Sequence, residues 1–322
     1  MKKILLSTAA ILMLFACQNE ATDATSLETN AIARRTCASQ DVLAEQLAAD
    51  PTLAIRMNKI EAFTQKAISS SNFRIVNGKI VIPVVVNVLY RTAAEDISAT
   101  QIQSQIDILN KDFTASNTDI NSVPNEFVGV TAGSAVNGID ITFELVKINR
   151  KATTKTSWGT RDAMKSTKKG GLDPTSPAST LNFWVCTIGG GILGYAQFPG
   201  GSAATDGVVC DSKYVGLSGS ANAPYNLGRT ATHEVGHWMN LRHIWGDASC
   251  GNDLVADTPI HRTANFTEVY PFASTCLPAH NEMTMNYMDY SNDDLMYMFT
   301  LGQKSRMSAL FVVGGIRAGF RN

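Results

Sequence analysis

This chain contains little histidine, little tryptophan and no excess of either charge. Its 322 residues include 5 histidines, 4 tryptophans and 10 prolines, and 27 basic against 28 acidic side chains leave a net charge of -1. Proteins that bind nucleic acid carry a basic surface, and nothing in this balance predicts one. No internal repeat or low-complexity block is present. With 44% hydrophobic residues, the chain can bury one or two sizeable cores.

The first 17 residues have the order of a bacterial export signal. Two lysines precede the apolar residues 4–16, which are too few to span a bilayer as a stable helix, and Cys17 follows. The segment LFAC resembles the lipobox of bacterial lipoproteins, in which the cysteine is lipidated and begins the mature chain. An apolar signal that merely ends in Cys17 is the alternative. We expect an exported bacterial protein, either secreted or lipid-anchored at the outer membrane or cell surface.

Export places the six cysteines in an oxidising compartment, where disulfides form. Cys250 and Cys276 flank a turn-rich stretch that a disulfide would stabilise, so we expect them to pair. Cys186 and Cys210 lie in two strand-like segments and are a second candidate pair, which geometry could still forbid. Cys37 then remains as a free thiol.

The N-terminal part before residue 74 differs in character from residues 74–322. Residues 18–30 are small, polar and acidic, as in a solvated tether. Residues 31–71 have an amphipathic helical pattern that Pro51 interrupts. We interpret residues 18–73 as a tether and propeptide; a small N-terminal subdomain that is never removed is the alternative.

The remainder of the chain predicts an α/β fold, which could also be classed as α+β. Strands are expected over four segments and helices over three; the strands are residues 79–90, 139–146, 181–186 and 207–211, and the helices are residues 100–113, the histidine-rich segment after residue 228 and residues 302–313. This order indicates a mixed twisted sheet behind the histidine-rich helix.

Three of the five histidines fall within the eleven residues HEVGHWMNLRH. On a helix, residues four apart share a face, so His233 and His237 can bind one ion while Glu234 lies beside its water. His243 lies off that face, so the helix must end before it. Asn240 is the expected end, because asparagine tolerates a left-handed backbone. Ordinary core histidines are the alternative, but this spacing is rare by chance.

These residues match the needs of a catalytic zinc ion. Such a site has three protein ligands, here His233, His237 and His243, and leaves one position for water. Zinc lowers the pKa of its water toward about 7, so Glu234 can accept a proton and pass it to a leaving amine. The motif therefore predicts hydrolysis of a peptide bond without a covalent intermediate.

The motif HExxHxxNxxH and the later segment NYMDYS resemble the metzincin metalloproteases, and within them the bacterial cytophagalysin-like branch of the pappalysin family. The likeness extends over roughly residues 75–310 through LNFWVC, GYAQFPGG and DGVVCD. It implies a catalytic domain over residues 74–322, with a twisted mixed five-stranded sheet and the active-site helix to about residue 241. An irregular C-terminal subdomain would follow over residues 242–322.

The resemblance also assigns roles to individual residues. Met288 would be the methionine of the Met-turn, an apolar floor beneath the zinc ion, and the Tyr290 hydroxyl would stabilise the tetrahedral oxyanion. Asp253, Asp257 and Thr258 would supply oxygen atoms to a structural calcium ion. Acidic turn residues without any metal are the alternative.

The chain departs from the family pattern in three places. Asn240 replaces a usual glycine, and Leu295 stands where close relatives often carry a cysteine of a second C-terminal disulfide. A bond between Cys186 and Cys210 is unusual by the same comparison, so this pairing stays open.

Asp293 and Asp294 follow the Met-turn, where the resemblance places the wall of the first primed pocket. A carboxylate there would favour arginine or lysine directly after the scissile bond. The same preference predicts autocleavage before Arg74.

Cys37 offers an explanation for latency. A thiolate is an excellent fourth zinc ligand and would displace the water, and the neighbouring Arg34 and Arg35 would favour the thiolate. A stray thiol or an intermolecular disulfide is the alternative.

Together these observations predict a monomeric zinc endopeptidase, made as a zymogen, that acts on protein or peptide substrates. Two other functions stay open. A metal-dependent hydrolase of a non-peptide amide would keep every zinc residue, whereas an adhesion protein on the same scaffold would be expected to have lost Glu234 or a histidine. The only membrane contact that we expect is the N-terminal lipid.

Overall fold

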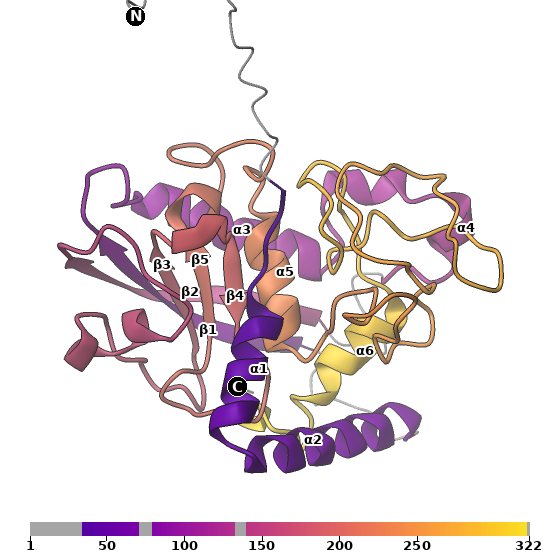
Figure 1. Cartoon of the computed structure of the whole chain (residues 1–322), viewed down its shortest axis with the longest axis horizontal. Coiled ribbons are helices and arrows are strands. Elements are labelled where there is room, and N and C mark those ends of the chain that lie inside the picture. Colours follow the sequence, from indigo (N-terminus) through magenta and orange to yellow (C-terminus); the bar gives the residue numbers. More distant parts are fainter. Residues whose placement is uncertain (1–33, 71–78, 133–139, 321–322) are drawn as a thin grey trace, which may run out of the picture. The chain divides into compact units, whose positions relative to one another are not determined.

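In the computed structural model, five strands form one mixed sheet in the order β2-β1-β3-β5-β4 (Figure 1). The strands are β1 (Lys79–Tyr90), β2 (Asp140–Ala152), β3 (Leu181–Cys186), β4 (Gly194–Ala196) and β5 (Val208–Asp211). The first three and β5 run parallel, and β4 pairs antiparallel with β5 at the edge. The β-branched run of β1 is buried between two neighbours, as a strand in a parallel sheet should be.

The structure describes residues 34–70, 79–132 and 140–320. The predictions for Cys17, for the tether and for cleavage before Arg74 lie outside these residues. One compact unit begins at Arg34, so the two N-terminal helices pack with the domain that follows them. No helix in the described part is long and apolar enough to cross a membrane.

Helices α3 (Ala99–Phe113) and α5 (Arg229–Trp238) cover one face of the sheet. Ser98 begins α3 by accepting a hydrogen bond from the Gln101 N–H at 3.0 Å, and the apolar stripe of α3 packs against β1 and β2. A second apolar cluster, around Trp184 and Tyr195, covers the opposite face. The histidine-rich helix α5 therefore packs directly on the sheet, beside α3, and the sheet lies behind it as predicted.

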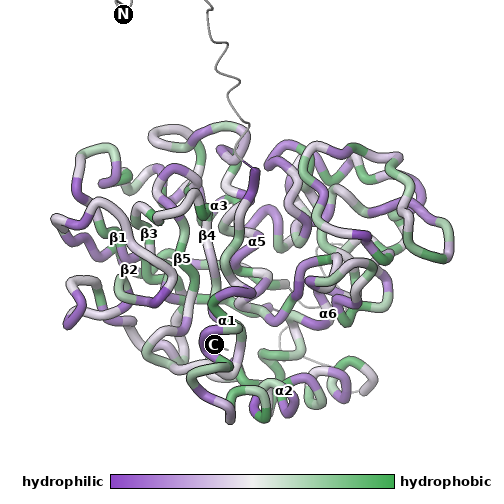
Figure 2. Tube along the Cα trace, in the orientation of Figure 1, coloured by the Kyte–Doolittle hydropathy of each residue, from purple (hydrophilic) through white to green (hydrophobic). Residues whose placement is uncertain are grey.

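Two helices precede the sheet, α1 (Ser39–Ala49) and α2 (Thr52–Ser69), separated at Pro51 as the sequence predicts. Figure 2 shows α2 as an alternation of hydrophilic and hydrophobic residues, as expected for a helix with one face against the domain. It packs against α6 (Leu301–Ala309), which a Thr300–Gln303 capping box begins. The shorter helices are α4 (Asn125–Val128) and single 3-10 turns at Thr118–Ser122, Ala163–Lys165, Thr167–Lys169, Gly189–Gly191, Ser212–Tyr214 and Ala318–Phe320.

Strand β2 continues to Ala152, beyond the predicted end at Val146. The pairing with β1 shifts there, because Val84 lies opposite Leu145 and Val85 lies opposite Lys147. Val146 is thus the extra residue of a bulge and is half exposed. A bulge reverses the alternation of apolar and polar residues, which is why the pattern ended early. The three-residue strand β4 was missed because so short a segment carries no alternation.

The disulfide between Cys186 and Cys210, which the sequence left open, is not formed. Both side chains are buried free thiols. In the parallel pairing of β3 with β5, Cys210 lies opposite Val185 and Cys186 lies opposite Asp211. A shift of one residue directs the two side chains to opposite faces of the sheet. Cys210 accordingly packs in the main core and Cys186 in the second cluster.

Between α5 and α6, where every residue is described, the chain forms no regular helix or strand. The predicted disulfide between Cys250 and Cys276 does form in this segment, with an S–S distance of 2.03 Å. We refer to residues 239–300 as the irregular segment.

Candidate active site

Helix α5 ends where the sequence predicts. Asn240 has a φ of 70°, the left-handed backbone that closes a helix. The Leu241 N–H donates to the Gly236 carbonyl at 2.9 Å, and the Asn240 N–H donates to the His237 carbonyl at 2.9 Å. This pair of hydrogen bonds is a Schellman motif, and it redirects the chain so that His243 turns back toward the helix.

The three imidazoles converge on one point. The Nε2 atom of His237 lies 3.1 Å from the Nε2 atom of His233 and 3.1 Å from that of His243. All three rings are buried. Cys37 from the N-terminal part adds its sulfur, so that the four ligand atoms lie within 4.8 Å of one another.

Each ring is oriented through its other nitrogen, Nδ1. His233 Nδ1 lies 2.7 Å from the Tyr287 carbonyl oxygen, and His237 Nδ1 lies 2.8 Å from the Leu241 carbonyl oxygen. His243 Nδ1 lies 2.5 Å from an oxygen of the Asp247 carboxylate. Carbonyl and carboxylate oxygens only accept, so each Nδ1 carries the proton and each Nε2 presents a lone pair.

These residues fit a zinc ion. Lone pairs that approach so closely repel one another unless a cation lies between them, and burial lowers the pKa of both His233 and His237, so protons do not fill the gap. Tetrahedral zinc with Zn–N bonds of 2.0–2.1 Å would hold two nitrogens about 3.3 Å apart, close to what is seen. Three imidazoles and one thiolate are also the donors that zinc prefers.

Glu234 lies beside the cluster without belonging to it. Its side chain is buried, and burial raises its pKa to about 7. Its Oε2 atom accepts a hydrogen bond from the Ser39 hydroxyl at 2.9 Å and lies 3.4 Å from the Cys37 sulfur. A carboxylate of this pKa is suited to accept and return a proton near neutral pH.

Met288 packs against α5, and Tyr290 packs against the histidines. A Cβ atom on Gly236 of α5 would lie 2.5 Å from the Met288 sulfur, so the glycine lets the methionine pack directly beneath the helix. The Tyr290 ring centre lies 4.9 Å from that of His243, and its hydroxyl donates to the Cys37 carbonyl at 3.2 Å. The hydroxyl is therefore directed at the segment that lies over the three histidines.

The arginines next to Cys37 have a different role from the predicted one. Burial and the Glu234 carboxylate both raise the pKa of the Cys37 thiol, and neither arginine offsets them. Arg35 instead reaches Asp293, with 2.5 Å between its guanidinium and the carboxylate, and Arg34 lies over the Phe266 ring. A thiolate at Cys37 therefore needs the metal ion itself.

The two predicted pocket residues separate. Asp293 is fully buried and accepts hydrogen bonds from Arg35 and from the Leu227 N–H at 2.8 Å. Asp294, the next residue in the same turn, is exposed. Asp293 thus pairs with Arg35 while Asp294 is exposed, and the substrate-pocket role of both residues stays a prediction.

The three predicted calcium residues also separate. The Thr258 hydroxyl lies 2.9 and 3.0 Å from the two carboxylate oxygens of Asp253, which is buried. Asp257 instead accepts from the Thr300 hydroxyl at 2.6 Å and from the Gly302 N–H at 2.7 Å. It stabilises the N-terminus of α6, where a carboxylate meets free backbone N–H groups. Calcium binding at Asp253, Asp257 and Thr258 stays a prediction.

Sequence reasoning missed three residues that contact the site. Ser39 holds Glu234, Asp247 orients His243, and Gln40 donates to Asp247 at 2.5 Å. Serine, aspartate and glutamine are common everywhere, so no local pattern marks them. The only available signal was that Ser39 and Gln40 directly follow the candidate ligand Cys37.

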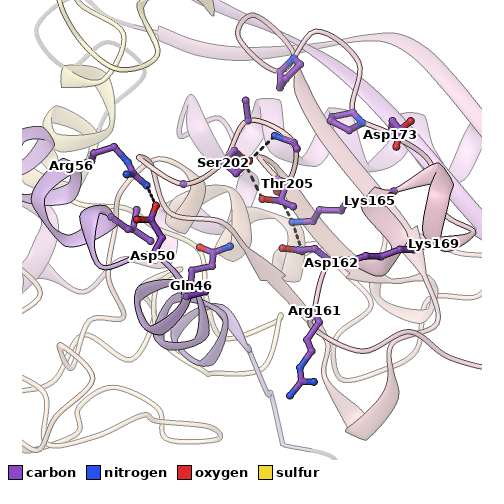
Figure 3. Close-up of a pocket in the computed structure, with 18 residues that line it drawn as sticks. Gln46, Asp50, Arg56, Arg161, Asp162, Lys165, Lys169, Asp173, Ser202 and Thr205 are labelled. Atoms are coloured by element: carbon purple, nitrogen blue, oxygen red, sulfur yellow. Dashed lines mark hydrogen bonds and ion pairs between the residues drawn. The ribbon is translucent and has the colours of Figure 1, made fainter.

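A cavity of about 780 Å³ lies away from this chemistry. It separates α1 and α2 from the loops at residues 161–177 and 201–205 (Figure 3). Two pairs of its charged groups bind each other: Lys165 lies 2.9 Å from Asp162, and Arg56 lies 2.7 Å from Asp50. None of the zinc-binding histidines is among the described residues that line it.

Comparison with known proteins agrees with this geometry. A family model described as pregnancy-associated plasma protein-A matches residues 187–312, which include the three histidines and Met288. Extracellular metalloprotease 1 of Coccidioides posadasii is 39% identical over 181 residues, which are 52% of this chain and 62% of that protein. An extracellular metalloprotease of Verticillium alfalfae is 33% identical over 240 residues, 70% of this chain and 76% of that protein.

Two solved structures from Tannerella forsythia are also similar. Mature mirolysin in complex with a cleaved peptide has 40% identity and a TM-score of 0.71, over 76% of this chain and 96% of that one. A promirolysin mutant has 37% identity and a TM-score of 0.79, over 89% and 97%. This chain belongs to the pappalysin family. The predicted fold class and the predicted class of enzyme, a metzincin metalloendopeptidase, are thereby confirmed. The promirolysin structure matches 89% of this chain, whereas the mature mirolysin structure matches 76%.

Proposed function

We propose that this protein is an exported zinc endopeptidase made as a zymogen, with Glu234 as the general base. The observation that carries the proposal is the convergence of three imidazoles and Cys37 beside the buried carboxylate of Glu234. Relatives named extracellular metalloproteases support export, and the promirolysin match supports a precursor.

Each residue has a defined part in peptide hydrolysis. Zinc held by His233, His237 and His243 would polarise the scissile carbonyl and acidify water. Glu234 takes a proton from the attacking water and returns it to the leaving amine, which its pKa of about 7 permits in both directions. The Tyr290 hydroxyl donates a hydrogen bond to the carbonyl oxygen as that oxygen gains negative charge.

The edge strand β4 supplies the backbone contacts for an extended chain. In this structure it is occupied by the segment around Cys37: the Leu193 N–H donates to the Thr36 carbonyl at 2.9 Å, and the Ala38 N–H donates to the Gly194 carbonyl at 3.1 Å. Cys37 and Gly194 form a parallel bridge. A substrate would add to the same edge by β-strand pairing, so the N-terminal segment and the substrate compete.

Asp293 would select arginine or lysine after the scissile bond, because Arg35 already occupies that position. The Arg35 side chain is almost fully buried, donates to Asp293 and to the Ser291 carbonyl, and stacks on Tyr225. A substrate arginine entering from the primed side would make the same contacts. The pro-segment therefore fills the pocket with the side chain that the pocket prefers.

Asp293→Asn should lower kcat/KM for peptides with arginine after the scissile bond by roughly 10²-fold, because a buried arginine would lose its counter-charge. Peptides with leucine at that position should change little. The measurement is the ratio of kcat/KM for the arginine peptides to kcat/KM for the leucine peptides, in wild type and in Asp293→Asn. The exposed Asp294→Asn is the matched control. An equal loss for both series, or a wild-type preference for apolar residues, would contradict the assignment.

Two finer features belong to the same proposal. A calcium ion at Asp253 and Thr258 is supported by the buried Asp253 carboxylate, whose pKa burial raises to about 6 and which a cation would stabilise in its charged form. Lipidation at Cys17 would hold the enzyme at the cell surface. It is supported by the order of the N-terminal residues, in which two lysines and an apolar run precede the cysteine.

Metal removal tests the function as a whole. The activated enzyme should cleave a denatured protein into peptides, lose this activity by about 10³-fold or more on chelation, and regain it with added zinc, because the metal supplies several kcal/mol of transition-state stabilisation. Mass spectrometry of the fragments identifies the cleaved bonds. Activity that persists in metal-free protein would refute the proposal, and hydrolysis of small amides without any peptide fragments would favour a non-peptide amide hydrolase.

A further inference from the structure

Four polar side chains lie together in the irregular segment, where a hydrophobic core would be expected. They are His261, Asn265, Glu282 and Asp289, each no more than 3% exposed. We refer to them as the buried polar cluster. None of them is a zinc ligand, and the proposed function gives them no role.

Asn265 is the centre of this cluster. Its Nδ2 atom donates to Asp289 Oδ2 at 2.9 Å and to Glu282 Oε2 at 2.9 Å. A side-chain amide has two N–H groups, so these two carboxylates use both of them. The Asn265 backbone N–H donates to the other oxygen of Asp289 at 2.8 Å.

His261 completes the cluster from the same loop. Its Nε2 atom accepts a hydrogen bond from the Met283 N–H at 2.8 Å, which leaves the ring proton on Nδ1. That Nδ1 atom faces Asp289 Oδ2 at 3.3 Å. The loop around residues 261–265 is thereby joined at several points to the segment around residues 282–289.

So many buried polar groups need a physical reason. Removing a carboxylate from water costs several kcal/mol, and apolar side chains of similar volume would usually stabilise the fold at least as well. The irregular segment, however, has no helix or strand to hold its backbone in place. A cluster in which each carboxylate is hydrogen-bonded specifies one arrangement of two loops, because any other arrangement leaves a buried charge without a donor.

The cluster ends at the active site. Asp289 Oδ1, which accepts from the Asn265 N–H, also accepts from the Tyr290 N–H at 2.8 Å. The next residue after Asn265, Phe266, has its ring 6.0 Å from the Tyr290 ring. On its other side, the Tyr290 ring packs 4.8 Å from Trp245 and 4.9 Å from His243. Asn265 thus reaches Tyr290 through one carboxylate and one aromatic contact.

We propose that Asn265 is a positioning residue for Tyr290 and acts through Asp289. The amide of Asn265 holds the Asp289 carboxylate, which fixes the Tyr290 backbone and so the place of the hydroxyl. This inference rests on the proposed function, in which that hydroxyl stabilises the oxyanion. Oxyanion donors contribute only when they are held at hydrogen-bond distance, so a small displacement should be seen in kcat rather than in KM.

The test is a double-mutant cycle with Asn265→Ser and Tyr290→Phe in the full chain, assayed after removal of the pro-segment. Asn265→Ser should lower kcat by 10- to 100-fold with KM within about twofold, because misplacement of a catalytic group has effects of this size. Tyr290→Phe should lower kcat by roughly 10²-fold or more. The double variant should be no slower than Tyr290→Phe alone, because a residue that acts only through the hydroxyl has nothing left to position.

Two measurements separate this role from a general loss of structure. In the uncleaved precursor, hydrogen exchange at the Tyr290 amide should accelerate in Asn265→Ser, while α6 should exchange as in the wild type. Asn281→Ser is the matched control: it lies in the same segment, and its side-chain amide also donates to a carboxylate, that of Glu126, which is outside the cluster. This control should keep the wild-type kcat.

Three results would overturn the proposal. The first is a kcat of the double variant that is reduced by the product of the two single-variant reductions. The second is an unchanged kcat in Asn265→Ser. The third is loss of bound zinc in Asn265→Ser, which would mean that the cluster supports the metal site rather than Tyr290. A Tyr290→Phe variant with wild-type kcat would instead refute the role of Tyr290 in the proposed function and this inference with it. Inactive wild-type enzyme would refute the function alone.

Discussion

Replacing Glu234 by glutamine should lower kcat by roughly 10²- to 10⁴-fold and leave bound zinc unchanged. Glutamine has the size of glutamate but cannot take a proton from water. The carboxylate lies outside the group of converging ligand atoms, so its loss should not weaken the metal site. Its stem packs tightly against β4, where a Cβ on Gly194 would lie 2.9 Å from Glu234 Cγ, so a side chain of equal size is the appropriate substitution.

The measurement combines peptide hydrolysis, metal content and mass spectrometry of the N-terminal region. Wild-type precursor incubated with zinc and calcium should release its pro-segment, and Glu234→Gln should not. The exposed Glu144→Gln on β2 is the matched control and should behave as wild type. Equal processing of wild type and Glu234→Gln would remove self-cleavage from the mechanism, and loss of zinc would show that Glu234 is structural.

Replacing Cys37 by alanine should make the precursor active before any cleavage. The sulfur and helices α1 and α2 are linked parts of one inhibitor, and linkage of this kind raises overall affinity by roughly 10²- to 10⁴-fold, so removal of one part should raise precursor activity by a similar factor. Self-digestion should follow. Because Ser39 also holds Glu234, Ser39→Ala should raise precursor activity by a smaller factor.

The activity of uncleaved precursor, measured at early times on a short peptide, tests this prediction. Cys186→Ala is the matched control. It also removes a buried free thiol, but one that lies in the apolar cluster around Trp184 and not among the three histidines. It should remain latent. A Cys37→Ala precursor that is as latent as the wild type would refute the role of the thiol in latency and favour a stray thiol.

Ion pairs and hydrogen bonds hold the N-terminal helices against the rest of the domain. Arg306 of α6 binds Glu61 of α2 through both guanidinium nitrogens, and Arg56 donates to the Gly200 carbonyl at 2.7 Å. Between such contacts the boundary is hollow, with cavities of about 780 and 630 Å³ beside α1 and α2. These open hollows limit the contact between the two helices and the rest of the domain, so we expect cleavage to free the helices without unfolding the domain.

Much of the site could be predicted because it depends on local backbone geometry. Helical spacing places His233 and His237 on one face whatever surrounds them, and Asn240 adopts the left-handed conformation that its side chain tolerates. The long apolar strand β1 and the helix α3 were predicted for the same reason. The hydrogen-bond partner of each site residue was harder to predict. The contact of Asp247 with His243 is an example that no sequence pattern indicated.

The sequence by itself determined the zinc-binding motif, the break after α5 and the separation of α1 from α2, because each depends on residues within a few positions of one another. Only the tertiary structure decided that Cys186 and Cys210 face apart, that Asp257 accepts hydrogen bonds at the start of α6, and that Arg35 pairs with Asp293. These outcomes depend on strand register and on loops that meet from distant parts of the chain. Such meetings are set by packing of the whole domain, which no local pattern records.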